Sequence, residues 1–349
     1  MTLLDTMMFS CPTCSASLQK NGGQYECARC SRSFPIIDGI PIFTRAQPYY
    51  GEIQNDQMRR LIEDTKVRGY KQALREHLDN DFVYTYASDE RRAMWMELLP
   101  LHPASTVLDA GCGWGTNTIP ISRQVRQIVA LDATYERVKF VEIRAEQTQA
   151  RNVIPVVASA TELPFPSGQF DLVAFNGVLE WLGASDHTMD PGVCQMKALE
   201  EAHKVLKPGG LIYLGIENRY SLRYFLGEQD DHSFLRFTSL MPRWLADAYC
   251  RLRTGERYST YTHSLGTYRR MLTDAGFVRL QSHYPWPNYR NPDVIVPLTR
   301  AKILGLLSGL QRSARSRRKW LYLSMLYAVT ALEGAGRACH SFCFVAQKS

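Results

Sequence analysis

The sequence contains no run of eighteen apolar residues, which excludes a transmembrane helix of ordinary length. It has no Gly-X-Y period, no heptad array, no internal repeat and no low-complexity tract, so collagen-like and long coiled-coil proteins are excluded too. The first ten residues carry Asp5 and no basic residue, and we therefore expect no secretory signal peptide. Apolar residues make up 45% of the 349 residues and charged residues 21%, which is ordinary for a globular chain with a substantial core.

The nine cysteines do not fit a set of paired disulfides, because their number is odd and five of them are scattered. The other four form two Cys-x-x-Cys pairs, Cys11/Cys14 and Cys27/Cys30, with twelve residues between the pairs. Each pair can form a tight turn that points two thiolates at one tetrahedral ion, and four thiolates make a closed, structural site. We therefore predict one Zn²⁺ in a reducing, cytoplasmic protein; two redox dithiols are the alternative, but no thioredoxin-like strand and helix flank either pair.

Acidic residues are absent from residues 299–320, which hold seven basic ones. Since 41 basic residues minus 34 acidic ones give +7, this segment accounts for the whole net charge. The apolar stretch that follows, residues 320–332, is too short to span a bilayer. Residues 300–332 therefore predict either an interfacial segment at a membrane or a helical cap on the core, with an anionic acceptor as partner.

The length predicts about two domains at roughly 150 residues each. Residues 1–45 are short, turn-rich and cysteine-bearing, and residues 46–103 have helical spacing that predicts a linker or lid. From residue 104 to 349, short apolar runs alternate with amphipathic helices, which predicts an α/β domain with a doubly wound, mostly parallel sheet. Two insertions interrupt that rhythm, at about 217–265 and 297–337.

A glycine-rich turn follows the first predicted strand of this domain, in Val107-Leu108-Asp109-Ala110-Gly111-Cys112-Gly113-Trp114-Gly115-Thr116. Glycines let the backbone approach a ligand closely because no Cβ intervenes. The second strand ends in Asp132, nineteen residues after Gly113, where a carboxylate can accept both hydroxyls of a ribose. Dinucleotide dehydrogenases and methyltransferases share this arrangement of glycine turn and acidic residue. Asp109 would repel the pyrophosphate of a dinucleotide and suits an ammonium group, which favours the methyltransferases.

Four further motifs accompany this turn: Glu162-Leu163-Pro164-Phe165, Gln169-Phe170-Asp171-Leu172-Val173, Val178-Leu179-Glu180-Trp181 and Val205-Leu206-Lys207-Pro208-Gly209-Gly210-Leu211. With them, residues 104–216 resemble the class I S-adenosylmethionine-dependent methyltransferases. The resemblance implies a Rossmann-like, seven-stranded sheet and S-adenosyl-L-methionine as cofactor. Residues 9–43, which end in Phe34-Pro35-Ile36-Ile37-Asp38-Gly39-Ile40-Pro41-Ile42-Phe43, resemble the Trm112-like zinc ribbons, which serve as scaffolds or present substrates.

The resemblance also implies roles for single residues in the cofactor site. It implies that Asp109 and the turn glycines Gly111, Gly113 and Gly115 contact the methionine end of the cofactor, and that Asp132 binds the ribose. The family often has Asp after the third strand to contact the adenine amine. Here that position is Ser159, with the backbone of Ala160 and Thr161 as alternatives, and Asn176 ends the fourth strand beside the methyl-transfer pocket.

The catalytic candidates lie in the insertion that begins at Glu217, because open α/β sheets build their sites at the carboxyl ends of strands. A hydroxyl acceptor needs a base within hydrogen-bond reach. His232 is the first candidate, with Asp231 or Asp230 to orient its imidazole, and His263 is the second. Surface groups or caps on backbone donors are the alternative interpretation.

These observations predict methylation of an oxygen on a sugar, a glycan or a lipid-linked intermediate, by a cytoplasmic protein with peripheral contact to the inner face of the membrane through residues 300–332. A methyltransferase for RNA bases is the alternative, because zinc ribbons precede this fold in some of them and the seven basic residues could meet phosphates. Against it, Lys20, Arg29 and Arg32 are the only cations of the ribbon. A methyltransferase for small natural products is the third possibility.

Overall fold

The structure is a computed structural model of the chain and describes residues 3–44, 51–183, 189–258, 260–334 and 336–349. The chain divides into two compact units. Unit 1 comprises Met1–Phe175, Met196–Tyr213 and Gln347–Ser349, and unit 2 comprises Asn176–Gln195 and Leu214–Ala346. The predicted boundary between ribbon and helical linker, at residues 45 and 46, lies outside the described residues.

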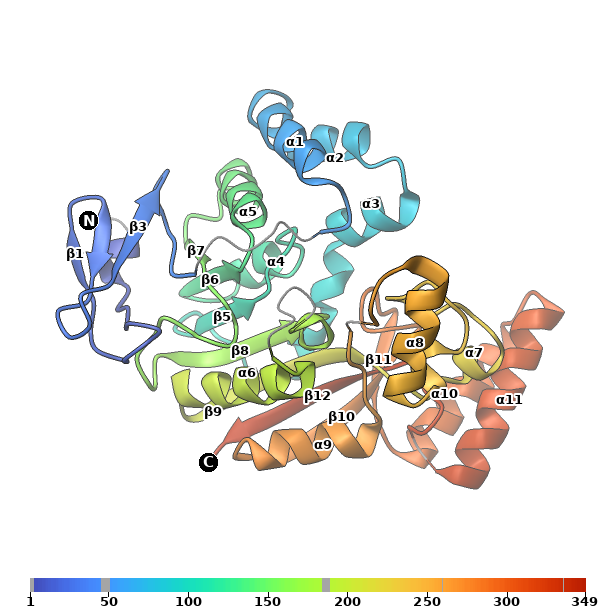
Figure 1. Cartoon of the computed structure of the whole chain (residues 1–349). Helices are drawn as coiled ribbons and strands as arrows, with labels where there is room; N and C mark the ends of the chain where they lie inside the picture. The colour runs from blue at the N-terminus through green and yellow to red at the C-terminus, as the bar shows by residue number, and fades with distance from the viewer. Residues whose placement is uncertain (1–2, 45–50, 184–188, 259, 335) are drawn as a thin grey trace. The chain divides into compact units, whose positions relative to one another are not determined.

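Unit 1 begins with a small antiparallel sheet in the order β1-β2-β3-β4, which follows a short 3₁₀ helix, η1 (Leu3–Thr6) (Figure 1). Its strands are β1 (Gln19–Asn21), β2 (Gln24–Glu26), β3 (Ser33–Ile37) and β4 (Ile40–Pro41). The alternation in β2 and β3 buries Tyr25 and Phe34, whose rings join Phe9 and Phe43 in an aromatic core. Phe9 also packs on Phe165, at 5.7 Å between ring centroids, so this core continues into the rest of unit 1.

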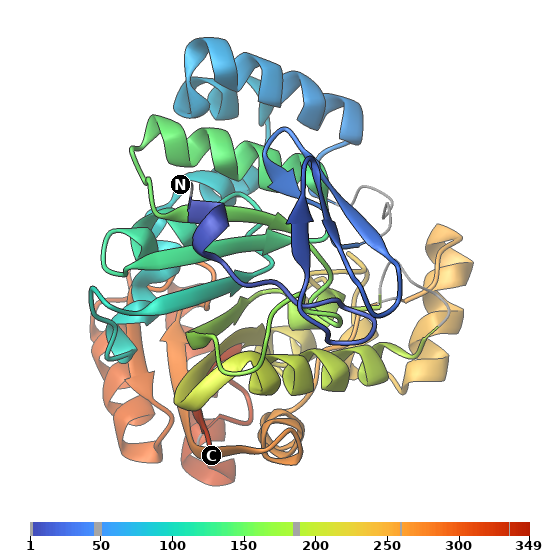
Figure 2. The ribbon, with the colours of Figure 1, turned by 90° about the vertical axis from the view of Figure 1, so that its left-hand side faces the viewer.

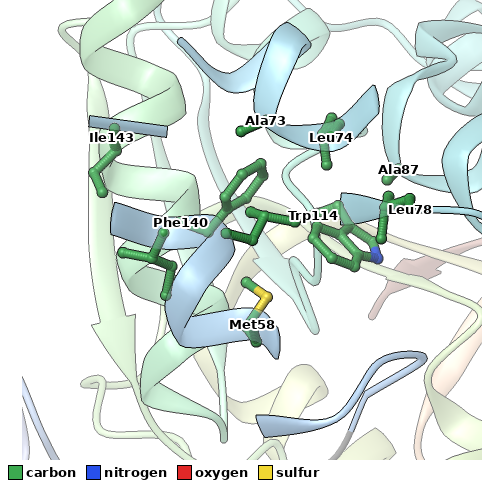
Figure 3. Packing of buried hydrophobic residues seen from close by; sticks show 10 residues of the cluster. Met58, Ala73, Leu74, Leu78, Ala87, Trp114, Phe140 and Ile143 are labelled. Atoms are coloured by element: carbon green, nitrogen blue, oxygen red, sulfur yellow. The ribbon is translucent and has the colours of Figure 1, made fainter. Parts of the chain in front are cut away.

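Four helical segments follow: α1 (Asn55–Arg68), α2 (Tyr70–His77), α3 (Asp81–Ser88) and the 3₁₀ helix η2 (Glu90–Leu98). Helix α1 buries Met58, Leu61, Ile62 and Thr65, which are spaced as one face of a helix. Figure 3 shows Met58 of this face beside Phe140 of α5 (Tyr135–Gln147) and Trp114, and Leu61 and Ile62 belong to the same cluster. Figures 1 and 2 both show α1 lying along α5, so the predicted linker covers this helix.

The main sheet of unit 1 has the strand order β9-β8-β5-β6-β7. The bounds are β5 (Thr106–Ala110), β6 (Gln127–Asp132), β7 (Val153–Val157), β8 (Phe170–Asn176) and β9 (Leu206–Glu217), whose last four residues belong to unit 2. The pairs β5–β6, β6–β7 and β5–β8 are parallel. Every residue of β5 is buried, as expected for a strand covered on both faces. Helices α4 (Thr118–Ser122), α5 and α6 (Pro191–Val205) cover the sheet, so the doubly wound, mostly parallel α/β fold is confirmed.

Unit 2 continues from β9 with the strand order β9-β12-β10-β11. Its strands are β10 (Phe277–Trp286), β11 (Val294–Pro297) and β12 (Ser341–Lys348, whose last two residues belong to unit 1). Its helices are η3 (Leu179–Trp181), α7 (Leu222–Phe225), η4 (Thr238–Leu240), α8 (Arg243–Thr254), α9 (Leu265–Asp274), α10 (Arg300–Arg312) and α11 (Arg317–Glu333). The main sheet therefore has eight strands, and the prediction of seven is wrong. The additional strand, β11, forms an antiparallel hairpin with β10.

The second predicted insertion forms a helical hairpin of α10 and α11 (Figure 1). Ile303, Leu307, Leu323 and Leu326 are fully buried, and Arg300 donates to the carbonyl of Ala331 at the end of α11. One face of the hairpin is therefore buried, as expected for the helical cap that was one of the two predictions for this segment. None of the helices in the described ranges has the length and apolar character needed to cross a membrane.

Candidate functional site

The four cysteines of the two predicted pairs come together in the ribbon of unit 1. Cys11 Sγ lies 3.6 Å from Cys30 Sγ, and Cys14 Sγ lies 3.4 Å from Cys27 Sγ. Disulfides would place the sulfurs at about 2 Å, whereas Zn–S bonds of about 2.3 Å place two thiolates of a tetrahedron about 3.8 Å apart. The residues present therefore fit a four-thiolate metal site.

The glycine-rich turn joins β5 to the short helix α4 and is held to the tip of β6. The N–H groups of Gly111 and Cys112 donate to the carbonyl of Leu131, at 2.7 and 2.9 Å. The N–H of Gly113 donates to Asp132 Oδ2 at 3.2 Å, and the N–H of Thr134 donates to Asp132 Oδ1 at 3.0 Å. The predicted ribose ligand thus lies directly beside the glycine turn, with lone pairs left on both oxygens.

At two positions of the turn, the backbone conformation explains why the residue is glycine. Gly111 has φ +86°, and Gly115 has φ +72°, both in the left-handed region that favours glycine. A Cβ at Gly115 would also lie 3.1 Å from Cγ2 of Val141 in α5. Gly115 therefore allows close packing of turn and helix, and its predicted contact with the cofactor stays a prediction.

Asp109 is a buried carboxylate at the end of β5, just before the turn. Its Oδ2 accepts a hydrogen bond of 2.6 Å from the hydroxyl of Thr118. Burial raises the pKa of Asp109 to about 6, although the Thr118 hydroxyl and Arg92 act in the opposite direction. A cationic ammonium group beside it would favour the charged carboxylate, as the predicted role requires.

The helical linker holds the glycine turn from its other side. Trp114, in the turn, is buried within the cluster of Figure 3, and its indole N–H donates to Glu52 at 3.1 Å. Glu52 also pairs with Arg137, whose guanidinium lies 4.1 Å from the Trp114 ring centroid. The buried Arg144 donates to the carbonyls of Trp114 and Ala87, at 2.8 and 2.9 Å. The linker and the turn are therefore tied by charge as well as by apolar packing.

Ser159, Ala160 and Thr161 follow β7, and Asn176 is the last residue of β8, at the positions in the fold that the sequence predicted. Ser159 Oγ accepts from the N–H of Thr161 at 3.2 Å and lies 2.8 Å from the Thr161 hydroxyl, while Ala160 between them is buried. This local turn occupies the Ser159 hydroxyl, and a contact with adenine stays a prediction. Asn176 is buried as the last residue of β8.

Unit 2 contains a buried polar cluster that the sequence did not single out as a whole. Glu217, the last residue of β9, accepts from Tyr289 at 2.9 Å and from Arg290 at 2.5 Å, both on Oε1. Glu180, in η3 just after β8, lies beside it and accepts from Tyr289 at 3.3 Å. Burial, together with the Glu217 carboxylate, raises the pKa of Glu180 well above its ordinary value. Burial alone would raise the pKa of Glu217 too, but the guanidinium of Arg290 brings it below its ordinary value.

His232, the first catalytic candidate, belongs to this cluster. Its side chain is 1% exposed, and one of its ring nitrogens lies within 4.8 Å of carboxylate oxygens of Glu180 and Glu217. Its imidazole also packs edge-on against Trp181, at 4.7 Å between centroids. The interpretation of His232 as an exposed loop residue is therefore wrong.

The predicted orienting carboxylates are engaged elsewhere. Asp231 pairs with Arg223 and Arg290 and accepts from the Tyr224 hydroxyl at 2.8 Å, and no hydrogen bond joins it to His232. Asp230 Oδ1 accepts from the backbone N–H groups of His232 and Ser233, as a cap does, and lies 3.9 Å from His232 Nδ1. Adjacent residues in this turn point in different directions, so the expected Asp–His hydrogen bond is absent from the described structure.

His263, the second candidate, is held as a structural group in unit 2. Its Nε2 lies 2.8 Å from Gln195 Oε1, and its backbone N–H donates to the Tyr268 hydroxyl at 2.8 Å. Burial, with Arg219 and Arg243 nearby, lowers the pKa of His263 to about 4. A neutral imidazole fits this position, and any catalytic role for His263 stays a prediction.

The comparisons with known proteins fit this geometry. Residues 108–214 match the family model described as a methyltransferase domain. The chain is 33% identical over 119 residues to an uncharacterized methyltransferase of Synechocystis sp., covering 34% of this chain and 50% of that protein. It is 32% identical over 142 residues to the malonyl-[acyl-carrier protein] O-methyltransferase of Herminiimonas arsenicoxydans, covering 39% and 47%. The chain thus spans about half the length of these curated relatives.

Among solved structures, the YcgJ protein from Bacillus subtilis is similar over 74% of this chain and 97% of that chain, with 16% identity and a TM-score of 0.42. The family match runs from β5 to β9 and includes the glycine turn, Asp132 and the strand that leads to Asn176. This part of the chain therefore belongs to the class I S-adenosylmethionine-dependent methyltransferases.

Proposed function

We propose that this protein transfers a methyl group from S-adenosylmethionine to an oxygen atom of a polar, anionic acceptor. The observation that carries the proposal is the glycine turn of unit 1, in which Asp132 accepts from the N–H of Gly113 and Asp109 is buried just before the turn. Such a turn can bring backbone close to a nucleoside, and its two carboxylates suit a ribose and an ammonium group. The relative named as an O-methyltransferase supports oxygen as the acceptor atom.

The cofactor, when bound, supplies a methyl carbon made electrophilic by its sulfonium. Asp132 would accept the ribose hydroxyls, Asp109 would face the ammonium, and Gly111 and Gly113 would leave room for the methionine chain. The protein's main task is then to align the acceptor oxygen behind the methyl carbon. A bond from oxygen to carbon forms, the carbon–sulfur bond breaks, and the acceptor's hydroxyl proton must leave.

The cluster of Glu180, Glu217 and His232 supports a site for that proton. All three side chains are buried within unit 2, and Glu180 follows β8 by four residues. Open α/β sheets bind their ligands at the carboxyl ends of such strands. His232 as the base remains our prediction within this proposal, with Glu180 and Glu217, rather than Asp231, beside its ring.

We further propose that the acceptor is a sugar, a glycan or a lipid-linked intermediate, and that the hairpin of α10 and α11 contacts it or an anionic membrane surface. Arg315, Arg317 and Arg318 are exposed at the turn between the two helices and at the start of α11. Trp320 and Leu321 are also exposed beside them, at 48% and 46%. A basic edge next to exposed apolar side chains suits an interface with anionic groups.

We propose Zn²⁺ as the ion of the four-cysteine site. Sulfur ligands in a closed shell suit Zn²⁺ in a structural role. Metal analysis of the purified protein should find one zinc per chain, and a Cys27→Ser, Cys30→Ser variant should lose it. Wild-type protein that contains no zinc and folds normally would contradict this assignment.

The experiment that tests the function is a transfer assay with a methyl-labelled cofactor and three acceptor sets: nucleotide sugars, lipid-linked glycans and ribosomal RNA. We expect label in a sugar or lipid-linked acceptor, and mass spectrometry of the product should find a methyl ether. Label in RNA would replace our proposal with the RNA alternative. Cofactor binding without transfer to any set, in a screen extended to small phenolic compounds, would contradict the proposed acceptor class.

A further inference from the structure

The cluster in unit 2 has buried polar atoms that the surrounding protein does not satisfy. Glu180 Oε2, Glu217 Oε2 and both ring nitrogens of His232 have no hydrogen-bond partner among the described residues. Glu180 and Glu217 are 0% exposed and the His232 side chain is 1% exposed. Buried groups of this kind are normally hydrogen-bonded, so four such atoms on three converging side chains indicate a bound species.

The charges around the cluster point to the same conclusion. Glu217 and Asp231 both pair with Arg290, and Asp231 also pairs with Arg223. Glu180 takes part in none of these ion pairs, so it is the one carboxyl group of the three without a guanidinium partner in these contacts. Buried charges are paired or coordinate a metal, so a cation bound beside Glu180 would let this group ionise, whereas an anion or a neutral ligand would not.

The ligand atoms have the right type and spacing for a metal ion. One oxygen from each carboxylate and one ring nitrogen of His232 lie within 4.8 Å of one another. Ligands at about 2.1 Å from a common ion lie roughly 3–4 Å apart, so small side-chain adjustments would complete three positions of a coordination shell. Carboxylate oxygens and one imidazole suit a divalent ion of the first transition row, such as Mn²⁺, and leave positions open for an oxygen ligand.

We propose that Glu180, Glu217 and His232 bind one divalent metal ion, separate from the four-cysteine site. Glu217 would use Oε2, because its Oε1 is held by Tyr289 and Arg290, which orient the carboxylate. The binding does not depend on the proposed function. Where the ion binds, His232 would be a ligand rather than the base of the proposed function.

The test is a titration of the full-length, zinc-loaded protein with Mn²⁺, followed by the electron paramagnetic resonance signal of free Mn²⁺. Thiolates are poor ligands for Mn²⁺, so the cysteine site does not compete. We expect one Mn²⁺ per chain in the wild type and affinity weaker by about tenfold or more in Glu180→Gln, which keeps the size of the side chain. Glu256→Gln removes an exposed carboxylate of the same unit and should leave binding unchanged.

A second measurement keeps the proposal testable if Glu180→Gln does not fold. Protein labelled with ¹⁵N-histidine should show a nitrogen coupling to bound Mn²⁺ in pulsed spectra, and His232→Gln should lose it. No Mn²⁺ binding in the wild type, or equal binding in Glu180→Gln and the wild type, would overturn the site and favour a proton shared by the two carboxyl groups. This readout needs no acceptor, so it is independent of the methyl-transfer assay. Absence of methyl transfer would not contradict the metal site, and absence of the metal would not contradict the proposed methyl transfer.

Discussion

At the scale of single residues, the cofactor site of unit 1 depends on two carboxylates with different environments, the buried Asp109 and the half-buried Asp132. Asp132 is held by two backbone N–H groups, from Gly113 and Thr134, and Asp109 by one hydroxyl, from Thr118. The N–H groups fix the direction in which Asp132 presents its oxygens. The weaker support of Asp109 leaves its charge dependent on a cationic partner.

Replacing Asp132 with alanine should weaken the binding of S-adenosylmethionine. The two ribose hydroxyls would lose a charged acceptor, and hydrogen bonds to charged groups contribute about 1.5–3 kcal/mol each. Titration calorimetry measures the effect, with circular dichroism to verify folding. Unchanged affinity in a folded variant would remove Asp132 from the site.

The affinity for S-adenosylmethionine should also depend on pH through Asp109. Burial raises the pKa of Asp109 to about 6, so its carboxylate becomes neutral as the pH falls through 6 and loses its attraction for the ammonium group. We expect binding to weaken between pH 7 and pH 5 in the wild type and to be weaker but flatter with pH in Asp109→Asn. Parallel pH profiles for the two proteins would show that Asp109 does not carry this dependence.

The residues that the sequence predicted well are those whose chemistry depends on neighbours in the chain. The two cysteines of each pair are brought together by one local turn. Gly113 and Asp132 are brought together by a single strand–helix–strand crossover, so their spacing in sequence predicts their contact. Glu180, Glu217 and Tyr289 come from three distant segments, and no spacing links them. His232 and Asp231 illustrate the opposite error, because adjacency in sequence does not make two side chains face each other.

At the scale of elements, the strands that were predicted are continuous apolar runs buried on both faces, such as β5 and β8. Strand β11 was missed because it has four half-exposed or exposed residues among prolines. Helix α8 was missed as part of the first insertion: its buried residues Ala246 and Cys250 are one helical turn apart, and its apolar Trp244 and Leu252 are 73% and 84% exposed. The 3₁₀ helix η2 was expected as an ordinary helix.

Replacing Arg315, Arg317 and Arg318 with glutamine should weaken binding of the hairpin of α10 and α11 to anionic surfaces. Each basic residue near such a surface contributes about 1 kcal/mol. Flotation with phosphatidylglycerol vesicles measures the loss, and added salt should reduce the wild-type binding because it screens the charges. Cofactor affinity should not change.

The matched control for this variant is a triple replacement of Arg59, Arg60 and Lys66 with glutamine in α1. It removes the same charge from another exposed surface, where these residues form ordinary surface ion pairs. Equal vesicle binding by both variants and the wild type, at low and high salt, would mean that the hairpin serves only as a structural cap.

At the scale of the whole molecule, two neutral histidines, the half-buried His263 and the buried His340, couple the free energy of unfolding to pH. Burial lowers the pKa of His263 to about 4 and that of His340 to about 3, from an unfolded value of 6.5. Below pH 6.5 the unfolded chain therefore binds protons that the folded chain does not, and the free energy of unfolding should fall as the pH drops from 7 towards 4. Urea unfolding at pH 7 and pH 5 measures this difference.

The contribution of His263 can be separated from that of other groups. The variant His263→Gln can still hydrogen-bond Gln195, and it should lose less stability than the wild type between pH 7 and pH 5. His102→Gln, which replaces an exposed histidine, should keep the wild-type dependence. Identical pH dependence in all three proteins would contradict the role of His263.

The contact between the ribbon and β7 has a consequence for solubility. Strand β7 is the last strand of the main sheet, and its outer edge would offer free backbone groups to another chain. Ile42 forms a parallel bridge to Val157, and the N–H of Phe43 donates to the Val157 carbonyl at 2.8 Å, so the segment after the fourth cysteine covers the end of that edge. If the proposed ion holds the ribbon in this fold, it also protects the sheet against edge-to-edge aggregation, and we expect loss of the metal to expose the edge of β7.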